Sequence, residues 1–305
     1  MNRWSSARSL GVWLSVLLML GLWAGAAVAA QTLAAQLAGP PGAWPITLRS
    51  FGLLLATLAG LSLGGVLLYR ILSAWTLHYQ IDRNAVTIRW LGNSWVVPMD
   101  RIAAIEVGLE RARLPLLGAL SFGYRRGVGR TAEGEPLHLF SAAPLSRSVI
   151  LRTSGAAYAI SPANRDAFVQ EVEGRRGLGV VQSQAEGVAR TKLVSYPFWT
   201  DRLVRGLLGA GLLFNLLLWA ILSWRYAMLP PEVALRFDAS GSAVGVAPRE
   251  QLLALPLIGL LVLLANAAVG VWVHRFLRIG ALLLLIGALM SQLLLAVSLL
   301  GVMLQ

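Results

Sequence analysis

The sequence contains no cysteine, and only 13% of its 305 residues are charged. The lack of cysteine excludes disulfide bonds, thiolate nucleophiles and cysteine-ligated metal sites. The low charge is unusual too, because a soluble protein of ordinary composition carries about 25% charged residues. Long uncharged apolar runs flank one charged middle stretch, from Trp75 to about Trp199. This distribution predicts a protein that crosses a membrane several times.

Lysine is nearly absent, with Lys192 the only one, yet the net charge is +12 because arginine is abundant. In a soluble protein this balance would suggest nucleic acid binding. In a membrane protein it has a simpler cause, since basic residues collect in cytoplasmic segments. We therefore predict no nucleic acid partner and expect the lipid bilayer to be the first partner.

Recognisable catalytic and metal-binding patterns are missing as well. The three histidines are not spaced with carboxylates as zinc ligands are. The sequence has no Gly-x-Ser-x-Gly elbow, and the glycines from Gly123 to Gly134 lack the Lys-Ser/Thr of a phosphate-binding loop. No predicted span has a charged residue at its centre, which argues against ion-driven transport. We predict a non-enzymatic protein with no cofactor, no metal and no catalytic residue.

Five apolar runs are long enough to cross a bilayer, whose apolar core of about 30 Å needs about 20 helical residues. They are residues 10–30, 51–69, 203–224, 252–273 and 279–300. The first run has a rival interpretation as a signal peptide, because arginines precede it and Ala27-Val28-Ala29 fits a cleavage site. Its length favours an uncleaved helix, since signal peptides have apolar regions of about 7–15 residues.

These runs divide the chain into four parts. We predict an N-terminal transmembrane hairpin at residues 1–74, a soluble domain at 75–176, a linker at 177–202 and a three-helix membrane block at 203–305, with an external loop at 225–250. With the soluble domain inside, all Lys and Arg except Arg49, Arg225, Arg236 and Arg249 lie on the cytoplasmic side. The N-terminus and the soluble domain are then cytoplasmic, and the C-terminus is external.

The soluble domain has the alternation of β-strands. Residues 85–91 place Val86, Ile88 and Trp90 on one face, between predicted turns at Asp82-Arg83-Asn84 and Gly92-Asn93-Ser94. Further strands are predicted at 75–81, 95–97, 102–107, 137–140, 149–151 and 157–160, with a turn at Ser154-Gly155 between the last two.

A helix is predicted to follow the last strand. Ser161 would cap it, Pro162 would occupy its first turn, and it would end near Gly174. Phe168, Val169 and Val172 form its apolar stripe. The whole pattern predicts six or seven antiparallel strands in a small curved sheet that is capped by one helix.

Three arginines are candidate site residues within the irregular, glycine-rich stretch from residue 111 to 135. Arg125, Arg126 and Arg130 are predicted to contact anionic lipid headgroups or a partner, because a basic residue beside an anionic membrane gains about 1 kcal/mol. The simpler alternative is a solvated loop that follows the positive-inside rule.

The soluble domain resembles the bacterial pleckstrin-homology (PH-like) domains that lie beside membrane helices. The resemblance covers residues 75–176 and rests on Tyr158-Ala159-Ile160-Ser161-Pro162 followed by Phe168, and on Val97-Pro98 followed by Ile102 and Ile105. It implies an antiparallel, barrel-like domain capped by one C-terminal helix, a non-enzymatic role in binding or assembly, and a bacterial inner membrane protein of the α+β class.

The external loop resembles a segment of the Sdp-type peptide-toxin immunity proteins. The resemblance covers about residues 207–273 and rests on Leu229-Pro230, Phe237-Asp238 and Gly241. Arg236 stands where the family usually has histidine. The candidate motif residues are therefore Pro230, Arg236, Asp238 and Gly241, and the alternative is a structured turn between two helices.

Two functions follow from these observations. The first is a non-enzymatic membrane protein whose cytoplasmic PH-like domain binds a protein partner, or a second copy of itself, in assembly or envelope signalling. The second is a permease for small molecules or peptides, or an immunity factor, that uses the C-terminal helices.

Overall fold

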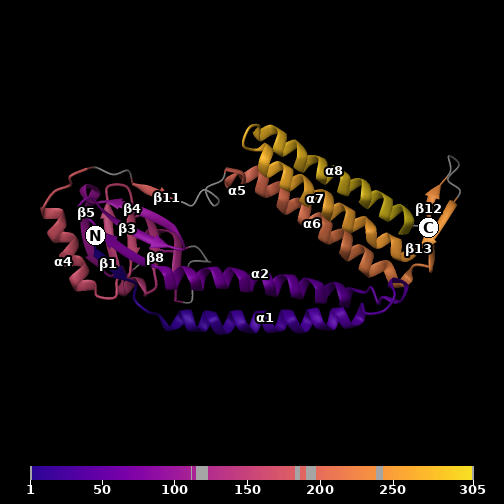
Figure 1. Cartoon of the computed structure of the whole chain (residues 1–305), viewed down its shortest axis with the longest axis horizontal. Helices are drawn as coiled ribbons and strands as arrows, with labels where there is room; N and C mark the ends of the chain where they lie inside the picture. The colour runs from indigo at the N-terminus through magenta and orange to yellow at the C-terminus, as the bar shows by residue number, and fades with distance from the viewer. Residues whose placement is uncertain are drawn as a thin grey trace. The chain divides into compact units, whose positions relative to one another are not determined.

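The computed structural model describes residues 2–110, 112–114, 123–182, 186–189, 197–237 and 243–303. The chain divides into two compact units (Figure 1). The first unit combines residues 1–24 with 60–191, and the second combines residues 25–59 with 192–305. The two long N-terminal helices each contribute to both units.

Five helices are long and apolar enough to span a membrane, in agreement with the five apolar runs. They are α1 (Leu10–Gln36), α2 (Leu48–Thr76), α6 (Arg202–Arg225), α7 (Ala254–Val273) and α8 (Arg278–Met303). Helix α2 does not end at Arg70 but continues by almost two turns to the first strand of the soluble domain. The lengths and composition are compatible with a multi-pass membrane protein.

The soluble domain contains two sheets. The first has the order β1-β2-β3-β4-β11, with β1 (Asn2–Ser5), β2 (His78–Ile81), β3 (Ala85–Trp90), β4 (Asn93–Pro98) and β11 (Gly187–Ala189). The second has the order β5-β9-β10-β8-β7-β6, with β5 (Ile102–Val107), β6 (Ala112–Arg113), β7 (Arg125–Thr131), β8 (Pro136–Ser141), β9 (Val149–Thr153) and β10 (Ala157–Ile160).

This topology differs from the predicted antiparallel, barrel-like sheet. Strands β8 and β10 are parallel, with Tyr158 opposite His138. Over the residues that the structure describes, the two sheets do not close into a barrel, so barrel-like closure is not confirmed. Strands β2 to β10 lie between His78 and Ile160, more than the six or seven predicted. The extra strands are β6 and β7, in the stretch that was predicted to be irregular.

Glycines explain why β7 was not predicted. Its sequence, Arg-Arg-Gly-Val-Gly-Arg-Thr, has only Val128 as a large apolar residue, so it lacks the apolar alternation of a half-buried strand. Position 129 must be glycine, because a Cβ atom there would lie 2.9 Å from the carbonyl oxygen of Arg113. Strand β6 therefore approaches the backbone of β7 closely.

The hairpin between β3 and β4 turns one residue earlier than predicted. Trp90 pairs with Asn93, so the loop has only two residues, Leu91 and Gly92. Their φ angles are +41° and +73°, as a type I′ turn requires at both central positions. Leucine rarely adopts such a φ angle, so no local signal marked this position.

The capping helix α4 (Arg165–Gly177) begins and ends three residues later than predicted. Its N-cap is Asn164, whose side chain accepts a hydrogen bond from the Ala167 amide. Ser161 is not the cap, because it connects strands inside the domain. Its hydroxyl accepts a hydrogen bond from the Ala142 amide at 2.8 Å, and its own amide donates to Tyr79 Oη at 2.9 Å.

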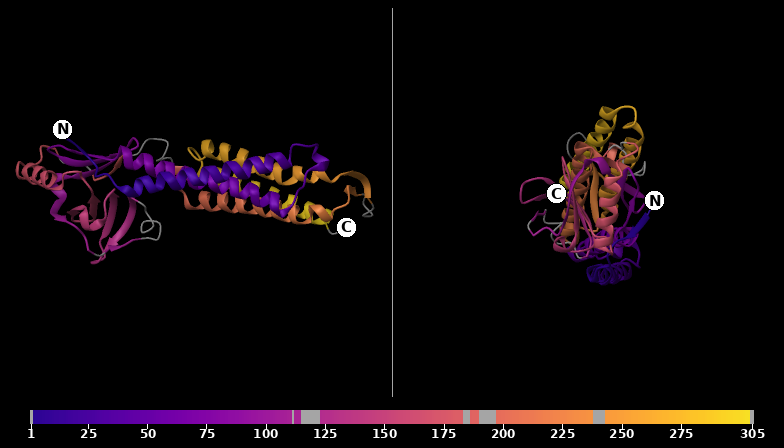
Figure 2. Two further views of the ribbon diagram at one scale, coloured as in Figure 1. Left: turned by 90° about the horizontal axis from the view of Figure 1, so that it is seen from below. Right: turned by 90° about the vertical axis from the view of Figure 1, so that its left-hand side faces the viewer.

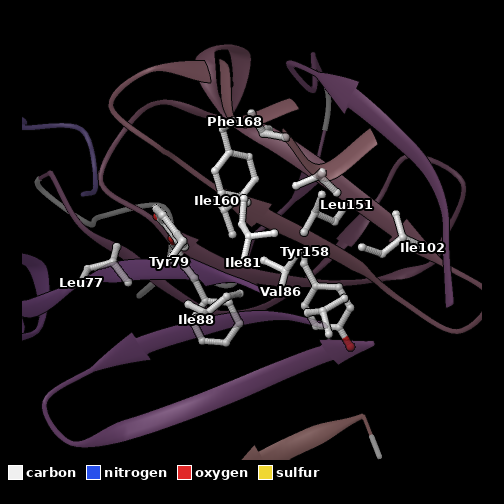
Figure 3. Packing of buried hydrophobic residues seen from close by; sticks show 14 of the residues in the cluster. Leu77, Tyr79, Ile81, Val86, Ile88, Ile102, Leu151, Tyr158, Ile160 and Phe168 are labelled. Carbon is white, nitrogen blue, oxygen red and sulfur yellow. The ribbon is translucent and has the colours of Figure 1, made fainter. Parts of the chain in front are cut away.

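The core of the domain lies between the sheets and α4. Figure 3 shows the buried side chains pointing toward one another from strands of both sheets, with Phe168 of α4 beside Ile160. Fully buried members include Tyr79, Ile81, Ile88, Ile102, Leu151, Tyr158 and Phe168. The apolar stripe predicted for α4 is confirmed by the burial of Phe168 and Val172.

Two edge strands of the first sheet come from outside the predicted domain. Strand β1 precedes the first membrane helix and pairs antiparallel with β2, and Ser5 accepts a hydrogen bond from the Ala163 amide. Strand β11 belongs to the predicted linker and pairs with β4. Because an open sheet edge exposes unpaired backbone groups, these segments protect both edges of the sheet.

The second unit contains α6, α7 and α8, which lie side by side in the orange to yellow part of Figure 2. Asn215 of α6 is buried, and its amide donates to the Pro256 carbonyl of α7 at 2.8 Å. Gln292 of α8 donates to the Gly259 carbonyl at 3.1 Å. At one end of the bundle, Asp201 caps α6 and pairs with Arg278 at 2.6 Å.

Candidate functional site

Strand β7 separates the three arginines that were predicted to act together. Successive side chains of a strand point to opposite faces, so Arg126 and Arg130 share the exposed face and Arg125 lies on the other. Arg125 donates to the Ala143 carbonyl at 3.1 Å. Arg130 donates at 3.1 Å to the Gly134 carbonyl, in the turn that follows β7. Of these three arginines, Arg126 lines a pocket between residues that the structure describes.

Arg126 lies between the soluble domain and the end of α2. Its guanidinium carbon lies 4.7 Å from the ring centre of Trp90 and 5.7 Å from that of Tyr69, and it donates a hydrogen bond to the Tyr69 hydroxyl. Arg70 donates to the Tyr124 carbonyl at 2.9 Å. Because Tyr69 and Arg70 end the second apolar run, these contacts hold the start of β7 where α2 leaves the predicted membrane region.

A pocket of about 220 Å³ opens beside Arg126, between the two sheets. Its walls are Trp90 and Trp95 from the first sheet and Arg126, Gly127, Val128, His138 and Phe140 from the second. The aromatic walls pack on one another, with ring centres 4.5 Å apart for Trp95 and His138 and 5.1 Å apart for Trp90 and Phe140. The pocket is therefore a rigid aromatic cavity with one cation at its rim.

The polar groups of the pocket favour a ligand that accepts hydrogen bonds. Trp90 is buried, and its indole N–H has no acceptor among the residues that the structure describes. The indole N–H of Trp95, the second tryptophan of the lining, also has no acceptor among these residues, and a buried donor without a partner costs free energy. Burial lowers the pKa of His138, partly opposed by Glu186, so its ring is neutral at pH 7. Arg126 is the charged residue of the lining, and it is positive.

Glu186 fixes the linker beside this pocket. It accepts a hydrogen bond from the Tyr158 hydroxyl and pairs with Arg101 at 3.1 Å. It directly precedes β11, in which Val188 lies opposite Trp95 of β4. The segment that leads to the third membrane helix is thus attached to one wall of the pocket.

The external-loop motif lies in the second unit, and its arrangement is described only in part. Pro230 lies two residues before the hairpin of β12 (Glu232–Phe237) and β13 (Ala243–Pro248), and the backbone of Arg236 pairs with Gly245. Asp238 and Gly241 lie outside the described residues. Within the described part of the chain, no three His, Asp or Glu side chains are close enough to hold a metal ion.

Sequence reasoning identified Arg126 but missed the rest of this site. Trp90 was predicted only as a buried strand residue, and Trp95 and His138 were not predicted to meet. They lie on strands that pair within different sheets, so only the packing of the sheets brings them together. The strands that carry Trp90, Trp95 and His138 also carry exposed polar residues. This combination of large rings and exposed polar residues was the one sequence signal that could have indicated the site.

Comparison with known proteins supports part of the resemblance described above. A family model for the bacterial PH domain matches residues 77–176. The chain thus combines a PH-like domain with five helices that are apolar enough to span a membrane. No curated protein and no solved structure matches the chain. Strands β1 and β11 lie outside the matched segment, and the likeness to Sdp-type immunity proteins stays a prediction.

Proposed function

We propose that this chain is a non-enzymatic protein of the bacterial inner membrane whose cytoplasmic PH-like domain binds a segment of a protein partner, or of a second copy of itself. Binding takes place beside the membrane, and the protein acts in assembly or envelope signalling. The observation that carries this proposal is the pocket between Trp90 and Arg126, which has aromatic walls and one cation at its rim.

The size of the pocket favours one side chain over a whole metabolite. Sites for drug-sized ligands measure about 300–1,000 Å³, and this pocket measures about 220 Å³. Its aromatic walls suit an apolar or aromatic side chain. Arg126 suits an adjacent carboxylate, because charge-assisted hydrogen bonds are stronger than neutral ones. We therefore expect a peptide segment in which an apolar residue neighbours an acidic one.

The position of Arg126 favours a partner segment next to the membrane. Arg126 contacts Tyr69, the last residue of the second apolar run. A segment that enters the pocket thus approaches the predicted inner surface of the bilayer. The juxtamembrane part of another membrane protein, or of a second copy of this chain, meets this requirement directly.

A photocrosslinking amino acid at Val128 tests the proposal in the full-length protein in its own membrane. Val128 lines the pocket and is 55% exposed, so it reaches a bound segment without disturbing the core. We expect one crosslinked species whose peptide contains an apolar and an acidic residue. Arg126→Gln should reduce its yield at least several-fold, and Arg130→Gln, the matched charge change on the same face, should leave it unchanged.

Two results would contradict this function. One is the absence of any crosslinked protein or dimer from position 128 while the protein remains folded. The other is a crosslink that is equally strong in the Arg126→Gln and Arg130→Gln variants, because it would not depend on the pocket.

A second cavity favours the alternative function in the C-terminal block. An apolar pocket of about 370 Å³ in the second unit is lined by residues that include Leu33, Trp44, Trp219, Leu253 and Leu257. It would hold an apolar ligand or peptide side chain. Leu257→Trp should fill this pocket and abolish a permease or immunity activity, while crosslinking from position 128 persists.

A further inference from the structure

A separate cavity of about 470 Å³ lies in the first unit, where three segments of the chain meet. The connection between β1 and α1 forms one wall, the first turn of α1 forms the second, and the end of α2 forms the third. The lining residues include Ser5, Ser6, Arg8, Ser9, Trp13 and Trp75. The partner-binding pocket beside Arg126 shares none of these residues.

The cavity lies at the depth where the chain enters and leaves the predicted membrane. The apolar helix α1 begins at Leu10, two residues after Arg8. Trp13 and Trp75 remain 62% and 59% exposed, and their ring centres are 6.3 Å apart. Exposed tryptophans near the ends of apolar helices are typical of the boundary between lipid and water.

The polar wall of this cavity is structurally fixed. The Ser6 hydroxyl lies 3.2 Å from the hydroxyl of Ser161 and within 3.3 Å of its carbonyl oxygen, which ties the connection to the end of β10. The Ala7 amide donates to the same carbonyl at 2.7 Å. The Ser9 hydroxyl accepts from the Gly11 amide at 3.2 Å. The segment that carries Arg8 is thus anchored on both sides.

The charge of the lining favours an anion. Arg8 is the charged residue of the lining, and none of the described lining residues is acidic. A zwitterionic headgroup would place an ammonium group where no carboxylate lines the wall. A phosphodiester without such a cation meets Arg8 and the serine hydroxyls instead, and phosphate groups bind well to arginine.

We propose that this cavity binds the headgroup of an anionic phospholipid, such as phosphatidylglycerol, from the inner leaflet. Arg8 neutralises the phosphate, and the hydroxyls of Ser5 and Ser9 contact the polar headgroup. Trp13 and Trp75 contact the part of the lipid that enters the apolar layer. The lipid would stabilise the connection between β1 and α1, and so hold the N-terminal strand in the sheet.

Native mass spectrometry of the full-length protein in mild detergent tests this site. The numbers of phosphatidylglycerol molecules retained by the wild type, Arg8→Gln, Arg8→Lys and Arg3→Gln are compared. Arg3 is exposed on β1 and does not line the cavity, so Arg3→Gln is the matched charge control. We expect a several-fold loss of retained lipid for Arg8→Gln only. Equal retention by Arg8→Gln and Arg3→Gln overturns the proposal.

Two further arms identify the ligand. Phosphatidylethanolamine should be retained several-fold less than phosphatidylglycerol, and equal retention contradicts an anion-selective site. Excess sodium phosphate should leave the lipid bound. If phosphate displaces it, the cavity binds inorganic phosphate and the lipid assignment is wrong. Ser5→Leu fills the cavity without changing the charge, so it should also lose the lipid if Arg8→Gln fails to fold.

Discussion

The indole ring of Trp4 packs edge-on against the phenyl ring of Phe168, with ring centres 5.5 Å apart and an interplanar angle of 81°. Trp4 precedes the first membrane helix, whereas Phe168 belongs to the helix that follows the last strand of the PH-like domain. Asn2 extends this contact by donating to Glu171 at 3.0 Å. The packing of β1 therefore ties the N-terminal segment to the helix that follows the last strand of the domain.

Trp4→Ala should destabilise the PH-like domain, because it removes an aromatic contact with the buried ring of Phe168. We expect a loss of about 1–3 kcal/mol in the free energy of unfolding, less than for a fully buried tryptophan. Unfolding by denaturant in detergent, followed by tryptophan fluorescence, measures it. Arg3→Ala on the same strand is the control, and an equal effect of both substitutions would show that β1 does not pack on α4.

Arg152 connects three carboxylates on the second sheet. It lies 2.8 Å from Glu106, 2.7 Å from Glu133 and 2.9 Å from Glu135. Arg152→Gln would leave three negative charges close together, at a cost of about 1–2 kcal/mol because the carboxylates are partly screened by water. Thermal unfolding in low and high salt measures this cost, which should shrink in high salt. The exposed Arg147→Gln should be nearly neutral, and an equally neutral Arg152→Gln would contradict the network.

The burial of His138 predicts that the stability of the PH-like domain depends on pH. Burial lowers the pKa of its ring in the folded state below the ordinary value of 6.5. The unfolded chain therefore binds the proton more tightly. The free energy of unfolding is not reduced by this effect above pH 6.5, and it falls as the pH drops below that value. The midpoint of thermal unfolding should decrease more between about pH 7.5 and about pH 5.5 in the wild type than in His138→Gln. Parallel pH profiles for the two proteins would rule out this contribution.

Packing should matter more than hydrogen bonding inside the membrane block. A Cβ atom on Gly259 would lie 3.2 Å from the Asn215 amide nitrogen and 3.3 Å from Gln292 Cγ, so Gly259→Leu should separate three helices. Asn215→Leu removes one interhelical hydrogen bond, worth about 0.6 kcal/mol on average. Unfolding in mixed detergent micelles should therefore rank Gly259→Leu as the more harmful substitution.

Gly287→Leu is the control for this comparison, because a Cβ atom at Gly287 meets nothing within 4 Å. It should be close to neutral. If Gly287→Leu and Gly259→Leu are equally harmful, the loss reflects the larger side chain in general and not the contact among α6, α7 and α8.

The lack of cysteine makes the orientation directly measurable. A single cysteine at Glu173 on α4 should react with a membrane-impermeant maleimide only after the inner membrane is opened. Met228 lies just after the C-terminal end of α6 and is 69% exposed. A single cysteine at this position should react in cells whose inner membrane is intact. The opposite pattern would place the PH-like domain outside and contradict both the orientation and the proposed partner site.

The sequence by itself determined the five helices that are long and apolar enough to span a membrane, because apolar runs of this length are stable in hydrocarbon whatever their neighbours are. It also determined β3 and the buried face of α4, where Val86, Ile88 and Phe168 alternate with polar residues at the period of their element. In these elements, the side chains that specify the structure lie within the element itself.

Only the tertiary structure decided β1, β7 and β11, the parallel pairing of β8 with β10, and the pocket beside Arg126. These strands are short or rich in glycine, and they are stabilised by backbone hydrogen bonds that any sequence can donate and accept. Their partners lie far away in the sequence, so no local period reveals them. The same holds for Arg126 and Trp90, which become one site because two separate sheets pack together and α2 supplies Tyr69.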